Sequence, residues 1–289
     1  MRRDIANDTK FSGILELNKY YDYETPYGYG GPLSEKHIPL QSQVEFLNEI
    51  KDKDKGIVSQ FIRFHPLLKN HTIASNLFEI RYLHDTVYMD STSTDIIMAN
   101  MDSKNRNMIR KAIKNAVEIE RREITDYKPF ISLYEETMLK DNADEYYFFN
   151  EDYFKIQQSL HGNACFFYAI KEGTIIAGAL MYYNENFMHY HLAGTRTEFR
   201  KFSPSNLLLY EAACWASKQG IKKFHLGGGI TQDDNLFGFK KQFNKNGKLP
   251  FYIGRTIFDN NAYTSLLNKR KLIHFNFDIN NNRLIQYRA

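Results

Sequence analysis

The segment HLGGGITQDD at residues 225–234 places an imidazole directly beside three consecutive glycines. Such glycines leave the backbone bare, which allows the close approach of a ligand or of another chain segment. Strand alternation puts Phe224 and Leu226 on one face of the preceding strand and His225 on the other. His225 is therefore either an acid or base of a binding site or a hydrogen-bonded structural side chain.

A second connection from a glycine to a helix lies upstream, in GTRTEFRKFSPSN at residues 194–206. Gly194 ends a predicted strand, and a helix is predicted to begin at Ser203. Free amides at a helix N-terminus attract anions. Three cations lie in the same segment: Arg196, Arg200 and Lys201. The combination indicates a cradle for a phosphate or pyrophosphate, and its spacing matches neither a Walker loop nor a dinucleotide-binding fingerprint.

Two phenols lie on a loop of glycines and prolines in TPYGYGGPL, residues 25–33. Glycine permits sharp turns and proline fixes φ, so this segment is predicted to turn. Tyr27 and Tyr29 each combine an apolar ring with a hydroxyl group that needs a partner. The loop is either a structural turn with its tyrosines on the core, or a binding loop whose rings surround a ligand.

A basic helix is predicted after Asp102 or Ser103, either of which can cap it. Its cations Arg106, Arg110 and Lys114 recur every four residues, with Lys104 and Lys111 nearby. An apolar stripe occupies another face: Ile109, Ala112, Ile113 and Ala116. The basic face is either solvated or an anchor for phosphates or another polyanion.

The elements that position these residues are clearest in the second half of the chain. Helices are predicted at 127–140 and 150–162, followed by a three-strand antiparallel meander: ACFFYAIKEG, TIIAGALMYYN and FMHYHLAGT. The next helix has Ser203 at its cap, Pro204 at its first position and Gly220 after its end. Four further elements are predicted in order: a strand at 221–226, a short helix capped by Asp233 or Asp234, a strand at 249–258 and a helix at 262–271.

The first half reads as mixed α and β. Strands are predicted at 11–17, from Gly56 to an end at Pro66, at 85–92 and at 117–124, and a helix at 42–52.

Length and composition limit the classes of protein to which the chain can belong. A chain of 289 residues with 43% hydrophobic residues suggests about two domains with a sizeable core. No window approaches a membrane span, and the start MRRDIANDTK lacks the apolar stretch of a secretory signal, so a cytoplasmic protein is expected. Cys165 and Cys214 lie in apolar runs, and no cysteine–histidine spacing suggests a metal site. A net charge of +4 is too weak to indicate DNA as a partner.

The order of these elements resembles the acyltransferase domain of the GNAT superfamily. Four motifs in sequence are similar to GNAT-related proteins allied to the Fem family of peptidoglycan bridge-forming aminoacyltransferases: PYGYGGPL, RFHPLL, RNMIRKAIKNAVEI and KKFHLGGGITQDDNLFGFKKQF. The likeness extends from about residue 11 to 258. The Fem pattern DFGG is HLGG here, which removes a carboxylate, while Phe239, Lys240 and Phe243 match the FKKQF helix.

The resemblance implies an α+β fold of two packed GNAT-like subdomains, each a mostly antiparallel twisted sheet flanked by helices. Residues 1–122 would form the acceptor side and residues 123–289 the donor side. The implied activity is N-acyl transfer to an amino group of a cell-envelope precursor, such as a nucleotide-linked amino sugar. The alternatives are a Fem-type aminoacyltransferase that uses aminoacyl-tRNA, and a catalytically silent relative that binds glycans or proteins.

The resemblance also implies roles for individual residues. An alkyl ammonium must lose a proton before it attacks an acyl carbonyl, and the candidate bases are His225, Asp233 and Asp234. Amides near Ala193–Gly194 and Leu226–Gly228 would stabilise the oxyanion. The implied donor-binding residues are Gly194, Arg196, Ser203, Ser205, Asn206, Gly227, Gly228 and Lys240. The implied acceptor-binding residues are Tyr27, Tyr29, Arg63, His65, Arg106 and Arg110.

The sequence is compatible with two acyl donors. Acyl-CoA, such as acetyl-CoA, needs only a pyrophosphate cradle and a narrow channel. Aminoacyl-tRNA needs a broad basic surface, for which Arg106, Arg110, Lys114 and the NKRK sequence at 268–271 could serve. The expected partners are a small-molecule or glycan-precursor acceptor and tRNA as the alternative donor, with peripheral membrane contact left open.

Overall fold

The computed structural model describes residues 1–11, 13–36, 38–73 and 75–289. Its α-helices are α1 (Leu40–Lys53), α2 (Thr94–Asn100), α3 (Ser103–Lys114), α4 (Lys128–Lys140), α5 (Glu151–Ile156), α6 (Pro204–Lys218), α7 (Asn235–Lys241) and α8 (Asn260–Ile273). Its strands are β1 (Arg2–Asp4), β2 (Tyr21–Glu24), β3 (Ile57–Arg63), β4 (Glu79–Asp90), β5 (Glu118–Glu123), β6 (Ala164–Lys171), β7 (Thr174–Tyr183), β8 (Phe187–Thr195), β9 (Lys223–Gly228) and β10 (Lys248–Ile257).

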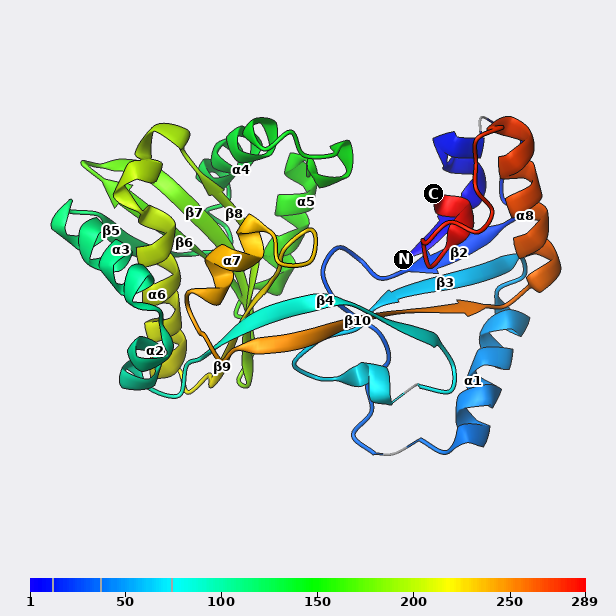
Figure 1. The fold of residues 1–289 in the computed structure, drawn as a ribbon, viewed down its shortest axis with the longest axis horizontal. Helices are drawn as coiled ribbons and strands as arrows, with labels where there is room; N and C mark the ends of the chain where they lie inside the picture. The colour runs from blue at the N-terminus through cyan, green and yellow to red at the C-terminus, as the bar shows by residue number, and fades with distance from the viewer. Residues whose placement is uncertain (12, 37, 74) are drawn as a thin grey trace. The chain divides into compact units, whose positions relative to one another are not determined.

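The chain forms two compact units. Unit 1 comprises Met1–His84 and Pro250–Ala289, and unit 2 comprises Asp85–Leu249 (Figure 1). Among the strand pairs described, β2–β3 and β8–β9 are parallel and the others antiparallel. The predicted α+β class with a mostly antiparallel sheet is confirmed.

Unit 2 has the strand order β4-β9-β8-β7-β6-β5. The predicted meander is confirmed, because β6, β7 and β8 pair antiparallel in sequence. β8 and β9 can pair in parallel because α6 forms the crossover between them. α6 begins with Pro204, and Gly220 follows its end with φ of 79°, both as the sequence predicts.

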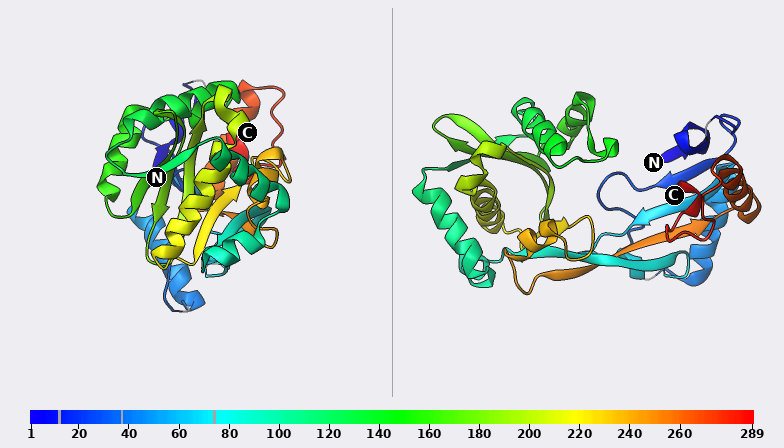
Figure 2. Two further views of the ribbon diagram at one scale, coloured as in Figure 1. Left: turned by 90° about the vertical axis from the view of Figure 1, so that its left-hand side faces the viewer. Right: turned by 45° about the horizontal axis from the view of Figure 1, so that its top comes forward.

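The two faces of the unit 2 sheet carry different layers. The larger core includes Met188 of β8 and Phe224 of β9, packed with residues of α2, α3 and α6. On the opposite side, α4 and α5 cover the part of the sheet near β7 and β8 (right view of Figure 2). Because side chains alternate along a strand, His189 and His225 lie on this second face.

Unit 1 has β1, β2, β3 and β10 in that order, and α8 packs on β3. Its main core joins residues distant in sequence, including Phe11, Val58, Leu266 and Tyr287. Both segments of unit 1 are therefore needed to bury its apolar side chains.

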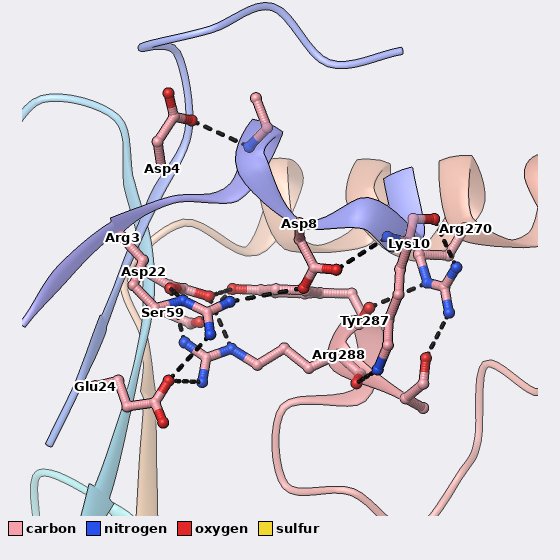
Figure 3. Close-up of polar contacts among 12 residues, drawn as sticks. Arg3, Asp4, Asp8, Lys10, Asp22, Glu24, Ser59, Arg270, Tyr287 and Arg288 are labelled. Carbon is pink, nitrogen blue, oxygen red and sulfur yellow. Dashed lines mark hydrogen bonds and ion pairs between the residues drawn. The ribbon is translucent and has the colours of Figure 1, made fainter. Parts of the chain in front are cut away.

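A buried ionic cluster accompanies this core (Figure 3). Asp22 and Glu24 of β2 are both buried carboxylates. Arg288 pairs with Asp22 at 2.7 Å and with Glu24 at 2.7 Å, and Tyr287 Oη donates to Asp22 at 2.9 Å. Arg3 contacts the same two carboxylates at 3.3 and 3.2 Å. We call this set the Asp22–Arg288 cluster.

Two sequence predictions differ from the structure. The strand expected at 11–17 is wrong: residues 9–11 form a short 3-10 helix, residues 13–17 have no strand, and β2 begins only at Tyr21. The compact units are divided at His84/Asp85 and Leu249/Pro250 and not at residue 122. The physical reason is that α8 and the last residues of the chain pack on β3 and on the core of unit 1.

Candidate functional site

The two parallel strands of unit 2 part in the middle of the sheet. Their register pairs Phe187 with Lys223, Met188 with Phe224 and His189 with His225, and it ends there for the described residues. β8 nevertheless continues to Thr195 and β9 to Gly228. The backbone groups that face this gap are left without the neighbouring strand as a partner.

Register shifts mark the same place on both outer neighbours. The β7–β8 pairing shifts between Leu180 and Met181, which leaves His191 as the extra residue of β8. The β4–β9 pairing shifts between Val87 and Tyr88, which leaves Leu226 as the extra residue of β9. Bulges of this kind bend a strand and redirect side chains, and they are common beside active sites.

Helix α7 brings a lysine to the parting strands (Figure 1). Lys240 is buried, its Nζ donates to the carbonyl of Gly228 at 2.7 Å, and the same atom lies 5.7 Å from the ring centroid of Tyr190. Burial lowers the pKa of the Lys240 amine to about 8. A buried amine that is partly neutral near physiological pH is a group that can donate a hydrogen bond or exchange a proton.

Asp234 fixes the start of α7. Its carboxylate accepts hydrogen bonds from the amides of Ile230, Thr231 and Phe237 at 2.6, 3.0 and 2.8 Å. A Cβ added to Gly229 would lie 2.0 Å from this carboxylate, so glycine is needed there. Asp234 is therefore the N-cap of α7, one of the two caps that the sequence predicted. Burial alone would raise the pKa of its carboxyl, but the hydrogen bonds from backbone amides hold that pKa below the usual value.

The other two candidate bases occupy contrasting positions. Asp233 is exposed, with φ of 54°, next to the cap. His225 is fully buried. Its Nε2 lies 3.0 Å from Thr86 Oγ1 and its Nδ1 lies 3.2 Å from His189 Nδ1.

Further aromatic side chains continue from this histidine pair along β8. The rings of His189 and His191 are 5.9 Å apart, and His191 Nε2 lies 2.6 Å from Tyr153 Oη. Burial lowers the pKa of His191 to about 3, so this imidazole is neutral. Sequence reasoning missed His189, His191, Tyr153 and Thr86. The HYH sequence in the last strand of the meander could have indicated the two histidines, because residues two apart in a strand lie on the same face of the sheet.

The predicted donor-binding residues gather around the start of α6. Ser203 holds the N-cap position with φ of 57°, but its hydroxyl donates to Met108 Sδ at 3.4 Å and makes no side-chain cap. Ser205 Oγ lies 2.9 Å from Thr195 Oγ1, and Asn206 Nδ2 donates to Asn105 Oδ1 at 2.8 Å. Side chains of neighbouring elements therefore hold the first turn of α6 in place, and the Ser203 side chain does not cap the backbone amides of that turn.

Gly194 and Arg196 have structural contacts of their own. A Cβ on Gly194 would lie 2.4 Å from the backbone carbon and oxygen of Leu133, so this glycine lets β8 approach α4. Arg196 Nε donates to the carbonyl of Ile175 at 3.1 Å, and its guanidinium is 3.6 Å from Glu136. Of the glycines after β9, Gly227 has φ of 76° and Gly228 accepts the hydrogen bond from Lys240.

The two arginines of the basic helix α3 lie in different environments. Arg106 is half-buried and donates to the carbonyl of Met98 at 3.2 Å and to that of Met101, which closes the end of α2. Arg110 is exposed and donates to Asn107 Oδ1 of its own helix at 3.0 Å. The exposed cations on α3 are Lys104, Arg110, Lys111 and Lys114.

The predicted acceptor residues of unit 1 lie together. Tyr29 packs edge-on against Phe251 and His65, with ring centroids 5.2 and 5.7 Å apart. Burial lowers the pKa of His65 to about 4. The amide of Gly30 donates to the carbonyl of Arg63 at 2.8 Å, which fixes the loop beside β3. Tyr27 is half-buried next to them. The packing of Tyr29 is therefore compatible with both interpretations of this segment, a structural turn and a binding loop.

No three His, Cys, Asp or Glu side chains among residues with determined positions converge as metal ligands do. No helix within the described ranges has the length and hydropathy to cross a bilayer.

One segment of the chain matches a known family model. Residues 103–241, all within unit 2, match the family model described as an acetyltransferase (GNAT) domain. No curated protein sequence matches the chain.

Solved structures similar to this fold cover nearly the whole chain. FemX is 16% identical, with 93% of this chain and 90% of FemX covered and a TM-score of 0.63. The C-terminal domain of a putative lysylphosphatidylglycerol synthetase from Agrobacterium fabrum is 14% identical, with 88% and 83% covered and a TM-score of 0.59. L-PGS from Bacillus licheniformis is 15% identical, with 90% and 84% covered and a TM-score of 0.58. Residues 103–241 therefore match a GNAT acetyltransferase domain, and the chain has a fold similar to that of FemX.

Proposed function

We propose that this protein transfers the acyl group of acyl-CoA, with acetyl-CoA as the first candidate, to an amino group of a cell-envelope precursor such as a nucleotide-linked amino sugar. The observation that carries the proposal is the parting of β8 and β9 after the His189–His225 pair, within the region that matches the GNAT domain. An extended ligand can take the place of a missing strand neighbour by pairing with the exposed backbone groups.

The residues around this gap suit an acyl-CoA. The first turn of α6 has no side-chain cap, and the exposed cations Arg200 and Lys201 lie just before it, a combination that favours phosphate. The bound donor would supply a thioester carbonyl carbon that an amine can attack. Lys240, held at Gly228 by its hydrogen bond, would be the nearest buried donor for the charge that develops on the carbonyl oxygen.

Acceptor binding is assigned in this proposal to the loop of unit 1. The loop and its neighbours combine flat rings with a cation, which suits a sugar or a nucleotide-linked glycan; the residues are Tyr27, Tyr29, Arg63 and His65. A cytoplasmic location belongs to the same proposal, since acyl-CoA and nucleotide-linked sugars are cytoplasmic metabolites.

The test is acyl transfer by the purified protein. Acetyl-CoA is supplied with nucleotide-linked amino sugars, and the released thiol and the acylated product are both measured. Replacing Arg200 and Lys201 together by Ala should raise the KM for acetyl-CoA about tenfold, equivalent to about 1.4 kcal/mol, with little change in kcat. Lys218→Ala, at the other end of α6, is the matched control. Equal KM values in all three proteins would contradict the donor assignment.

The basic surface of α3 favours a second candidate function. Lys104, Arg110, Lys111 and Lys114 are exposed on one helix, as a tRNA-binding surface would require. Transfer from glycyl-tRNA to a peptidoglycan precursor, with none from acetyl-CoA, would establish a Fem-type aminoacyltransferase instead. Binding of a glycan precursor without turnover of either donor would indicate a catalytically silent relative.

A further inference from the structure

Two large apolar side chains at the end of α8 are open to solvent. Phe275 is 86% exposed and Leu272 is 84% exposed, more than any other large apolar side chain in the described ranges. Both belong to one end of the same helix, since α8 ends at Ile273. Single exposed apolar residues are common on protein surfaces, whereas neighbouring ones with a polar rim mark sites of interaction with proteins or membranes.

The packing of unit 1 does not account for Leu272. α8 buries Tyr263, Leu266 and Leu267 in the core of unit 1. Leu272 comes nine residues after Tyr263, which is about two and a half turns, so it lies on the opposite face of the helix. The other residues of that face are polar: Asn261, Ser265 and Asn268. A leucine on this face contributes nothing to the core of the unit.

Lysines border the two apolar side chains. Lys271 Nζ donates to the carbonyl of Phe275 at 2.7 Å and lies 5.4 Å from the centroid of the Phe275 ring. Lys269 comes two residues earlier and is partly exposed. α8 itself contains neither Asp nor Glu. Because lysine can lay its aliphatic stem along an apolar surface and keep its ammonium in a polar layer, the helix end is an apolar tip with a cationic rim.

The segment beside this helix end adds positive charge. His274 Nε2 lies 3.2 Å from the carbonyl of Lys10. Arg270 donates to the same carbonyl at 2.7 Å (Figure 3). Burial, followed by the charge of Arg283, lowers the pKa of Lys10, so these cations lie close together. Cations exceed acids here: Lys10, Lys269, Lys271 and Arg283 are accompanied by Asp8 and Asp278.

We propose that unit 1 docks on a membrane surface that contains anionic lipid, with Leu272 and Phe275 in the boundary between headgroups and acyl chains. Lys269 and Lys271 then lie among the headgroups. We call these four residues the α8 tip. The inference goes beyond the proposed function and does not depend on it, because docking needs neither an acyl donor nor an acceptor.

The chemistry of the α8 tip favours a lipid surface over other occupants. The boundary of a bilayer accepts projecting Leu and Phe side chains, and anionic headgroups attract the lysines beside them. A stable protein interface buries about 800 Å² on each partner, far more than two side chains provide. The phosphates of an RNA would contact the lysines and leave Leu272 in water.

The first experiment measures binding of the purified protein to vesicles by co-sedimentation. At low salt the wild type should bind vesicles of phosphatidylcholine with phosphatidylserine at least about tenfold more strongly than vesicles of phosphatidylcholine alone. Leu272→Asn with Phe275→Asn should weaken that binding about tenfold or more. Lys269→Gln with Lys271→Gln should remove most of the preference for phosphatidylserine. A wild type that does not bind, or double variants that bind as the wild type does, would overturn the proposal.

Leu139→Asn is the matched control for loss of an exposed leucine. Leu139 is 67% exposed in the last turn of α4, and its neighbour Lys140 is paired with Asp141 at 2.8 Å. Vesicle binding of this variant should equal that of the wild type. Equal melting temperatures of all variants would show that the α8 tip acts on binding and not on folding. Loss of vesicle binding in Leu139→Asn as large as in the Leu272 and Phe275 double variant would contradict a site at the α8 tip.

The second experiment locates the inserted side chain. The wild type has one tryptophan, Trp215, which belongs to unit 2. Phe275→Trp adds an indole at the α8 tip. On phosphatidylserine vesicles with brominated acyl chains, this variant should lose the fluorescence that the substitution adds, while the fluorescence of the wild type stays unchanged. Unquenched fluorescence of vesicle-bound Phe275→Trp would overturn the insertion of this residue.

The remaining outcomes identify other occupants. Self-association that Leu272→Asn with Phe275→Asn abolishes, without vesicle binding, would overturn the proposal in favour of a contact between two copies of the chain. Binding of tRNA that Lys269→Gln with Lys271→Gln abolishes, without vesicle binding, would overturn it in favour of RNA. A wild type that transfers no acyl group contradicts only the proposed function, and one that binds no vesicle contradicts only the docking, so the two failures are distinguishable.

Discussion

At the scale of single residues, Lys240 is the side chain whose environment departs most from its sequence context. It is the last residue but one of the short helix α7, yet it is buried with its Nζ on the carbonyl of Gly228. Burial lowers its pKa from 10.5 to about 8, so the folded protein holds the charged form at a cost. That difference corresponds to about 3 kcal/mol.

The pH dependence of this cost can be measured with Lys240→Met. Below about pH 8 the folded wild type bears the full cost, because both states are protonated. Between about pH 8 and 10.5 the unfolded state binds more protons, so the stability of the wild type rises with pH. Urea unfolding should therefore show Lys240→Met gaining most over the wild type at pH 7, with the gain falling by about 3 kcal/mol by pH 10.5.

Lys241→Met is the matched control for that comparison. Lys241 is the next residue and is exposed, so its substitution should leave the pH dependence of stability unchanged. A stability difference between Lys240→Met and wild type that is the same at both pH values would contradict the lowered pKa.

At the scale of elements, the contact between β8 and α4 depends on one missing side chain. A Cβ on Gly194 would meet the backbone of Leu133 at 2.4 Å. Backbone atoms cannot move aside as a flexible side chain can, so Gly194→Ala must shift the helix or the strand. We expect a loss of roughly 3 kcal/mol in the free energy of unfolding, at the upper end of the cost of overpacking.

Gly238→Ala is the matched control, since this glycine lies inside α7 and an added Cβ would meet nothing within 4 Å. That substitution should stabilise the protein by up to about 1 kcal/mol, because alanine is the better helix former. Urea unfolding of both variants checks the pair. Equal effects of the two alanines would mean that β8 and α4 are less closely packed than described.

Local patterns predicted the elements of unit 2 well and its polar interior poorly. The start of α6 at Pro204 and the cap of α7 at Asp234 depend on neighbouring residues, and both were readable from the sequence. The pairing of His189 with His225 joins residues 36 apart, and no local pattern contains it. The strand expected at 11–17 failed for a related reason: Ile14 and Leu17 are exposed, while Phe11 and Leu15 are buried in the core of unit 1 by distant residues.

At the scale of the whole molecule, the Asp22–Arg288 cluster ties the end of the described chain to its beginning. Arg288→Met would leave the buried carboxylate of Asp22 with Arg3, and that of Glu24 with Arg3 and, at 3.5 Å, Arg63. Removing one partner of a buried ion pair typically costs 3–5 kcal/mol, because the other charge loses its compensation, so we expect about 3 kcal/mol here.

Hydrogen exchange locates this effect. In Arg288→Met the amides of β2 and β3 should exchange faster than in the wild type, while those of β6 and β7 in unit 2 keep their rates. Arg283→Met, an exposed arginine in the same segment, is the control. Faster exchange in both units alike would show that the cluster does not act on unit 1 in particular.

The division of the chain also bears on how the protein is made. Unit 2 is one uninterrupted segment, whereas unit 1 is completed only by Pro250–Ala289. As the polypeptide leaves the ribosome, Asp85–Leu249 can reach its native contacts while β3 still lacks β10 and Asp22 still lacks Arg288. During that interval β2 and β3 expose edges that invite chaperones or neighbouring nascent chains. Translation of Pro250–Ala289 closes that window, so slow codons in that stretch would prolong exposure of the early strands.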